Sequence, residues 1–149
     1  MKIYVDADAC PVKAEAVRVA ERHKLPIVFV ANSWMRLPDG ALVERVVVEE
    51  GADAADDWIA SNIGPDDIAI TADIPLASRC VKAGAKAIGP TGKPFSDANI
   101  GMALAMRDLM SDLRESGEVK GYNAAFTKQD RSNFLQALEK AVQDAKRNR

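Results

Sequence analysis

The chain of 149 residues is poor in the side chains on which several kinds of functional site depend. It has one histidine, His23, and two cysteines, Cys10 and Cys80. A single histidine argues against His-rich zinc sites and against Ser-His-Asp catalysis, because both are built on imidazole groups. The two cysteines show neither a close pairing nor a metal-ligand spacing, which is typical of proteins from a reducing compartment.

Long apolar runs are also missing. No stretch of 18 apolar residues occurs, and the first apolar segment meets Asp6, so we expect neither a membrane span nor a signal peptide. These features predict a cytoplasmic protein without a membrane partner. The composition, 48% hydrophobic and 28% charged, argues against disorder, and the length predicts one domain over residues 1–149.

The net charge of −2 points to neither nucleic acid nor membrane, but the charges are unevenly distributed. Residues 49–73 contain no Lys or Arg and eight carboxylates, and because the whole chain carries −2, the rest carries +6. The eight are Glu49, Glu50, Asp53, Asp56, Asp57, Asp66, Asp67 and Asp73. An acidic centre with basic flanks suits a metal-dependent enzyme that acts on phosphates, although a merely uneven surface gives the same pattern.

Strand-like and helix-like segments alternate along the chain, which predicts an α/β fold. The expected strands are 2–6, 26–32, 42–50, 66–73 and 85–89, and the expected helices are 11–23, 52–63, 74–84, 96–116 and 127–146. Such alternation is typical of a three-layer, Rossmann-like fold, in which a mostly parallel central sheet has helices on both faces. The last two helices form a helical C-terminal extension. Ligand sites of these sheets lie beyond the carboxyl ends of the strands.

Five aspartates fall where that site is expected. Asp6 and Asp8, in the sequence VDADACP, follow the first strand, Asp73 ends the strand 66–73, and Asp56 and Asp57 lie on the helix between them. Carboxylates without histidine or cysteine select hard cations, so we expect all five to bind Mg²⁺ or Mn²⁺. Asp6, Asp56, Asp57 and Asp73 are the candidate catalytic residues.

Each of these residues also has a structural interpretation. An aspartate near a helix start commonly serves the helix dipole, and for any one of them this is the better interpretation. The set of four at element edges favours function. Arg79, Lys82 and Lys93 are candidates for binding substrate phosphates, although each alone could equally be a solvated surface charge.

Four motifs in order resemble those of the YaiI/YqxD family of uncharacterised bacterial proteins. They are DADACP, GADAADDWI, TADIPLA and FTKQDRSNF, and they extend over essentially the whole chain. The family is PIN-like and related to the NYN and 5′-nuclease domains. The run AADDWI resembles the ADDxI of polymerase-associated 5′ nucleases, whose paired aspartates bind metal. The resemblance thus implies a PIN-like fold, and it implies metal-binding roles for Asp6, Asp56, Asp57 and Asp73, with Asp8 as an acidic neighbour.

The leading hypothesis is a Mg²⁺- or Mn²⁺-dependent nuclease that hydrolyses phosphodiester bonds, with RNA favoured over DNA by analogy with PIN domains. One alternative is a phosphatase of the haloacid-dehalogenase type, with Asp6 as nucleophile, Asp8 as acid and Thr71 as strand-end hydroxyl. Another is a non-catalytic module that binds metal or RNA. The edge strand and the C-terminal helices could each support a homodimer.

Overall fold

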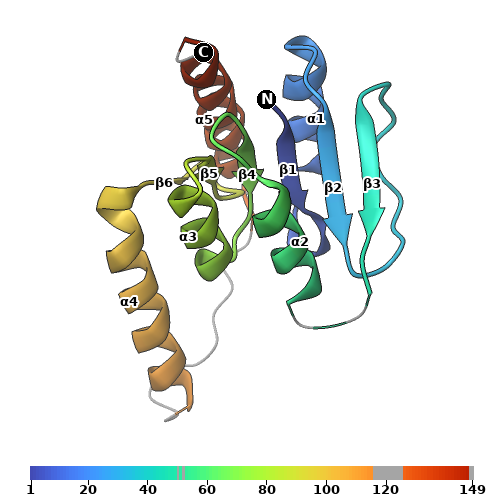
Figure 1. Ribbon diagram of the computed structural model, residues 1–149. Coiled ribbons are helices and arrows are strands. Elements are labelled where there is room, and N and C mark those ends of the chain that lie inside the picture. Colours follow the sequence, from blue (N-terminus) through green and yellow to red (C-terminus); the bar gives the residue numbers. More distant parts are fainter. Residues whose placement is uncertain (50, 52, 116–125, 148–149) are drawn as a thin grey trace.

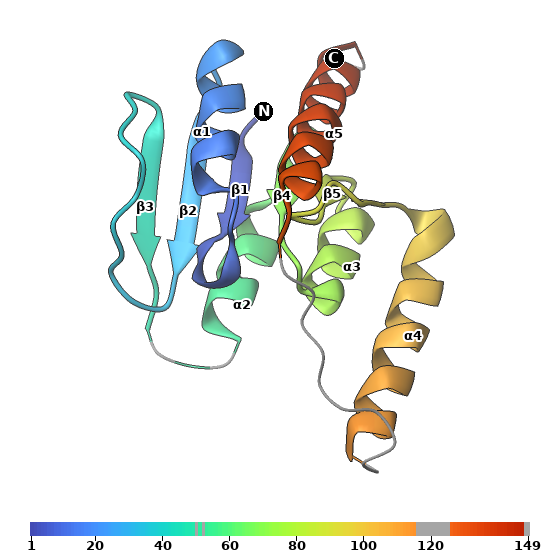
Figure 2. The same ribbon diagram turned by 180° about the vertical axis from the view of Figure 1, so that it is seen from behind.

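The computed structural model describes residues 1–49, 51, 53–115 and 126–147 and confirms the predicted α/β fold (Figures 1 and 2). Its middle layer is a six-stranded sheet of order β3-β2-β1-β4-β5-β6. The strands are β1 (Ile3–Asp6), β2 (Ile27–Ala31), β3 (Val43–Val47), β4 (Ile68–Ile70), β5 (Lys86–Ile88) and β6 (Pro94–Phe95). All neighbours pair in parallel except β6, which runs antiparallel to β5.

Helices cover both faces of this sheet. They are α1 (Lys13–Arg22), α2 (Ala54–Asn62), α3 (Ile74–Lys82), α4 (Asp97–Glu115) and α5 (Lys128–Arg147), and a short 3₁₀ turn, η1 (Ala7–Ala9), follows β1. α1 and α5 lie on one face, and α2 and α3 on the other (Figures 1 and 2). α4 extends from the body beside α3, and Met102, Met106 and Leu109 on it are exposed.

The alternation of side chains along β1 explains why there is a hydrophobic core on each face of the sheet. Ile3 and Val5 pack into the core beneath α1 and α5, whereas Tyr4 packs beneath α2 and α3. Successive strand residues point to opposite faces, so Asp6 shares the orientation of Tyr4. The strand therefore directs the first candidate ligand toward the side of α2 and α3.

Two differences from the sequence prediction concern the start of the first helix and an additional short strand. The first helix begins at Lys13 rather than at Pro11, because residues 7–9 form a 3₁₀ turn and Val12 becomes the residue before the helix. The Gly/Pro/Lys loop contains the short strand β6, where the Gly89 N–H donates to the Lys93 carbonyl over 2.8 Å. Pro94, which has no N–H, is tolerated there because β6 lies at the edge of the sheet.

The last helix belongs to the core. Phe134, Leu138 and Val142 of α5 are fully buried against the sheet and α1. His23 at the end of α1 hydrogen-bonds to Glu139 of α5. Among the residues that the structure describes, no helix is both long and apolar enough to cross a membrane.

Parallel pairing gathers the helix starts at one edge. β1, β2, β4 and β5 all end at the same side of the sheet, which we call the carboxyl edge. Because a helix that follows a strand begins where the strand ended, α1, α2 and α3 all start there as well. This edge is where the candidate aspartates meet.

Candidate functional site

Asp6 ends β1 at the carboxyl edge and is held by the neighbouring strand. The hydroxyl of Thr71, which directly follows β4 and is 2% exposed, donates to the Asp6 carboxylate over 3.0 Å. The backbone N–H of Asp73 donates to the same hydroxyl over 2.9 Å. Partial burial raises the pKa of Asp6, the Thr71 hydrogen bond opposes that shift, and the charges of Asp73 and Asp8 add to it.

Asp73 is the N-cap of α3. Its carboxylate accepts from the Leu76 N–H over 2.9 Å, and Pro75 occupies the first turn. The structural role weighed from the sequence is therefore present. The carboxylate has a second oxygen, and the charge of Asp73 also raises the pKa of Asp56.

Asp56, in the first turn of α2, completes a group of three interacting carboxylates. Its pKa is raised to about 7 by burial first, then by the charges of Asp73 and Asp6 and by a side-chain hydrogen bond with Asp73. Burial and the repulsion between neighbouring carboxylates together favour the protonated form of Asp56 up to the neutral range. We call Asp6, Asp56 and Asp73 the acidic cluster.

Asp8 lies beside the acidic cluster and contacts the segment after β2. Both oxygens of its carboxylate accept from the Asn32 N–H, over 3.0 and 3.3 Å. The side-chain oxygen of Asn32 is buried and has no hydrogen-bond partner among the described residues. The side-chain oxygen of Asn32 is a potential metal ligand that the sequence did not indicate, because Asn32 stands there simply as the last residue of an apolar strand.

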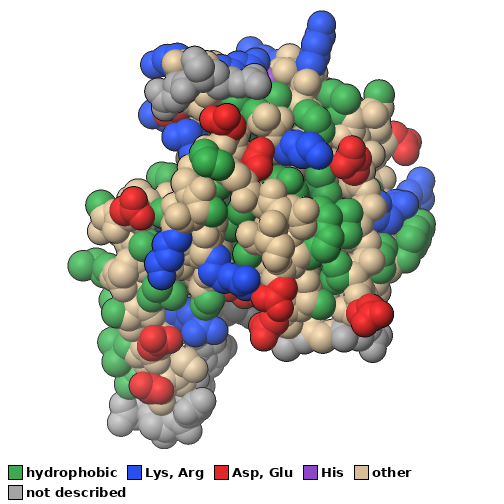
Figure 3. Space-filling view, viewed as in Figure 1, with side chains coloured by type: hydrophobic (Ala, Val, Ile, Leu, Met, Phe, Trp, Pro, Cys, Tyr) green, Lys and Arg blue, Asp and Glu red, His purple; other side chains and the backbone are tan. Residues whose placement is uncertain are grey.

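Asp57 points away from the cluster. Its carboxylate pairs with Arg79 of α3 over 2.8 Å, and the Asp57 side chain is 63% exposed. One residue of helix corresponds to a rotation of about 100°, so neighbours in sequence face different surroundings. Over this face of the molecule acidic and basic side chains are interspersed (Figure 3). Arg79 thus meets the expected ligand Asp57 in an exposed ion pair.

The two predicted substrate-binding lysines lie at opposite edges of the sheet. Lys82 ends α3, two turns from Asp73, and therefore lies toward the amino edge. Lys86 begins β5 at that same edge, whereas Lys93 follows β5 near the carboxyl edge. A phosphatase of the haloacid-dehalogenase type also needs a lysine later in the chain, for which the residues after Asp73 offer Lys82, Lys86 and Lys93. Of these three, only Lys93 lies near the carboxyl edge.

The donor set of the acidic cluster fits a hard divalent cation. Burial is the largest cause of the raised pKa of Asp56 and Asp6, and a cation would offset the repulsion between carboxylates that adds to it. The unpartnered oxygen of Asn32 near Asp8 is a further ligand of the type that Mg²⁺ and Mn²⁺ accept. Within the described ranges, no three Asp, Glu, His or Cys side chains form a ready-made metal site. Mg²⁺ is commonly held by only one or two carboxylates together with waters.

Cys10 lies beside this edge but is unsuited to nucleophilic chemistry. It is 7% exposed, and burial raises the pKa of its thiol. Because the thiolate is the reactive form, a raised pKa disfavours nucleophilic chemistry at Cys10. The interpretation of Cys10 as a small packing residue is confirmed.

Comparison with known proteins identifies relatives over the whole chain. The model described as "Uncharacterized BCR, YaiI/YqxD family" matches residues 4–144. A UPF0178 protein of Rhodopseudomonas palustris strain TIE-1 is 60% identical over 148 residues, which are 99% of this chain and 94% of the relative. A UPF0178 protein of Rhodospirillum rubrum is 59% identical over 150 residues and the full length of both chains. No solved structure matches the chain.

Proposed function

The chain belongs to the YaiI/YqxD family, and we propose that it is a divalent-metal-dependent nuclease that hydrolyses phosphodiester bonds of nucleic acid, RNA before DNA. The observation that carries the proposal is the meeting of Asp6, Asp56 and Asp73 from three separate segments at the carboxyl edge. The resemblance to PIN-like nucleases implies the same chemistry for these positions.

The acidic cluster would hold Mg²⁺ or Mn²⁺, with Asp8 as an acidic neighbour. When bound, the metal supplies an activated water and neutralises charge on the phosphodiester. The side chains of the protein position the ligands. The Thr71 hydroxyl fixes the orientation of the Asp6 carboxylate, and the cap on α3 fixes Asp73, so the repelling carboxylates are held in place before any substrate arrives.

Calorimetric titration with Mn²⁺ and Mg²⁺ tests the proposal when wild type and Asp6→Asn are compared, with labelled RNA and DNA oligonucleotides incubated alongside. We expect binding and cleavage in the wild type and the loss of both in the variant. Asp66→Asn is the matched control, because Asp66 is an exposed aspartate before β4 at the opposite edge. Undiminished cleavage by Asp6→Asn would exclude the nuclease assignment.

A non-catalytic module that binds metal or RNA is the second candidate. It is favoured by the absence, in the part of the chain that the structure describes, of a ready-made site with three protein ligands. Metal-dependent binding of RNA with no turnover in the same experiment would support it. No metal binding at all would leave the aspartates with capping and solvation roles only.

A homodimer is a separate proposal. Met102, Met106 and Leu109 recur at helical spacing on the exposed side of α4, and such a stripe commonly packs against another helix. This supports an association through the C-terminal helices rather than through the edge strand. Light scattering coupled to size exclusion distinguishes a monomer from a dimer, and Met106→Glu should shift any dimer to monomer.

A further inference from the structure

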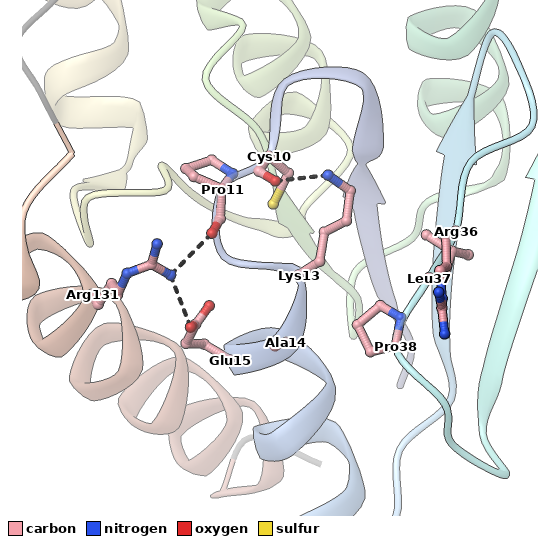
Figure 4. Close-up of a pocket in the computed structure, with 9 residues that line it drawn as sticks. All are labelled: Cys10, Pro11, Lys13, Ala14, Glu15, Arg36, Leu37, Pro38 and Arg131. Atoms are coloured by element: carbon pink, nitrogen blue, oxygen red, sulfur yellow. Dashed lines mark hydrogen bonds and ion pairs between the residues drawn. The ribbon is translucent and has the colours of Figure 1, made fainter.

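A groove of about 460 Å³ runs across the start of α1, on the face opposite α2 and α3 (Figure 4). Its walls come from three segments far apart in sequence: residues 10–15, the segment after β2, and the first turn of α5. It lies in the size range of pockets that hold small ligands. None of the functions weighed from the sequence involves this groove.

Three cations line the groove, and two of them are held by the backbone of one wall. Lys13 donates from Nζ to the Cys10 carbonyl over 2.8 Å. Arg131 donates to the Pro11 carbonyl over 3.2 Å and to the Glu15 carboxylate over 3.0 Å. Arg36 lies on the opposite wall (Figure 4). With Glu15 offsetting one charge, the groove keeps an excess of two positive charges.

An exposed aromatic ring lies on the segment after β2, just before Arg36 in the chain. Trp34 is 67% exposed, and the guanidinium of Arg45 stacks 4.9 Å from its ring centroid. Arg45 lines a second hollow that shares Leu37 and Pro38 with the groove. Cations and an exposed indole therefore follow one continuous surface. An exposed tryptophan backed by arginine is a platform on which a nucleobase can stack.

The groove leads toward Asp8, which lies beside the acidic cluster. The Asn32 N–H donates to that carboxylate, and Trp34 and Arg36 follow Asn32 by two and four residues. On the other wall, Cys10 and Pro11 follow Asp8 by two and three residues. A chain of phosphates in the groove would thus leave it beside Asp8, at the edge that the acidic cluster occupies from the other face.

We propose that this groove binds a single-stranded nucleic acid, with phosphates at Lys13, Arg36 and Arg131 and an unpaired base on Trp34. The inference rests on the proposed function only for what happens at the acidic cluster. Stacking on an indole requires a base free of its complement, which selects a single strand over a duplex. Arginine guanidinium groups match phosphate oxygens in geometry and charge.

Binding is measured without metal, so that it does not depend on cleavage. Fluorescein-labelled 12-mers of uridine and of thymidine, and a duplex of the same length, are titrated in EDTA and followed by anisotropy. We expect Arg36→Gln to weaken binding of the single strands about fivefold or more and to lower the salt slope by about 0.7, which is one phosphate contact. Arg18→Gln is the control, because Arg18 is an exposed arginine on α1 outside the groove.

The stacking contact has its own readout. Trp34→Ala should weaken binding of the same oligonucleotides about fivefold or more, and Trp34→Phe should retain most of it, because phenylalanine still offers a ring. In Trp58→Phe, Trp34 is the only tryptophan left, and its fluorescence should be quenched as oligouridine is added. Quenching of Trp58 in Trp34→Phe would contradict the proposed contact.

The outcomes separate the groove from the nuclease. Weaker binding by Trp34→Ala and Arg36→Gln supports the groove even if the wild type cleaves nothing with Mn²⁺, in which case only the nuclease fails. Wild-type affinity in both variants overturns the groove, whether or not Asp6→Asn abolishes cleavage. A stronger effect of Arg79→Gln than of Arg36→Gln also overturns it, because the strand would then cross α2 and α3. Tighter binding of the duplex than of the single strands would also overturn the groove proposal.

Discussion

The Thr71 hydroxyl lies 3.0 Å from the Asp6 carboxylate and joins the two central strands where both end. Thr71 is buried, and its oxygen also accepts from the Asp73 N–H, so one side chain positions two members of the acidic cluster. A structural hydroxyl and a candidate metal site are therefore coupled. The first prediction follows from this coupling.

Replacing Thr71 by valine keeps the shape but removes the hydroxyl. The Asp6 carboxylate loses its donor and the Asp73 N–H loses its acceptor, so the free energy of unfolding at pH 7 should fall by about 1–3 kcal/mol. Urea denaturation measures this change. Thr71→Ser is the control because it keeps the oxygen, and it should lose less. Equal stability of wild type and Thr71→Val would show that the hydrogen bond contributes nothing.

Metal-free protein should lose stability as pH rises through the neutral range. The pKa of Asp56 is about 7 in the folded protein and lies above its usual value of 3.8. The folded state therefore keeps a proton that the unfolded state releases. The contribution is fully present below pH 4 and is lost as pH rises through about 7.

Asp56→Asn removes the titrating group and should flatten this decline. In EDTA at pH 8 the variant should be more stable than wild type by about 1 kcal/mol, a figure reduced for the partial exposure of Asp56. The difference should vanish near pH 4. Thermal or urea unfolding across this pH range gives the measurement, and parallel curves for the two proteins would contradict the prediction.

The candidate ligands should differ in importance. Asp57 is largely exposed and paired with Arg79, so Asp57→Asn should change Mn²⁺ affinity by less than about threefold. Asp6→Asn and Asp73→Asn should weaken it about tenfold or more, because both belong to the acidic cluster. Asparagine still caps α3, which keeps the fold comparable. Calorimetry ranks the three, and an equal loss in all would restore Asp57 to the site.

Replacement by alanine should change the stability of the protein in opposite directions at two glycines. A Cβ at Gly92, where φ is +92°, would lie 2.6 Å from backbone atoms of Asn133, so Gly92→Ala should cost about 2 kcal/mol or more. At Gly101, within α4, a Cβ meets nothing within 4 Å, and Gly101→Ala should gain about 0.5–1 kcal/mol. Thermal unfolding of both variants tests the close docking of α5 on this loop.

The order of the longer elements and the gathering of Asp6 and Asp73 at one edge of the sheet could be predicted from the sequence, because both follow from local patterns. In the sequence, Asp6 and Asp73 each stand where a predicted strand ends, and parallel pairing of the two strands brings such ends together. The separation of Asp56 from Asp57 could not be predicted in the same way. It depends on how far α2 is rotated about its axis, which is fixed by the burial of Ala55 and Ile59 against the sheet.

The groove could not be predicted from the sequence for a different reason. Its walls include Arg131 and Pro11, whose contact joins the FTKQDRSNF motif to the DADACP motif. Nothing in the local sequence of either motif indicates the other, because the contact arises only when α5 packs beside α1. The exposure of Trp34 could likewise not be predicted, because a tryptophan in a loop packs inward as readily as it faces solvent.

The central position of β1 has a consequence for biosynthesis. Asp6 is made early, but its strand lies between β2 and β4, and the residues that complete the acidic cluster follow much later in the chain. The groove wall at Arg131 comes later still. A chain still emerging from the ribosome therefore cannot assemble the acidic cluster before Asp73 has emerged, or the groove before Arg131 has emerged.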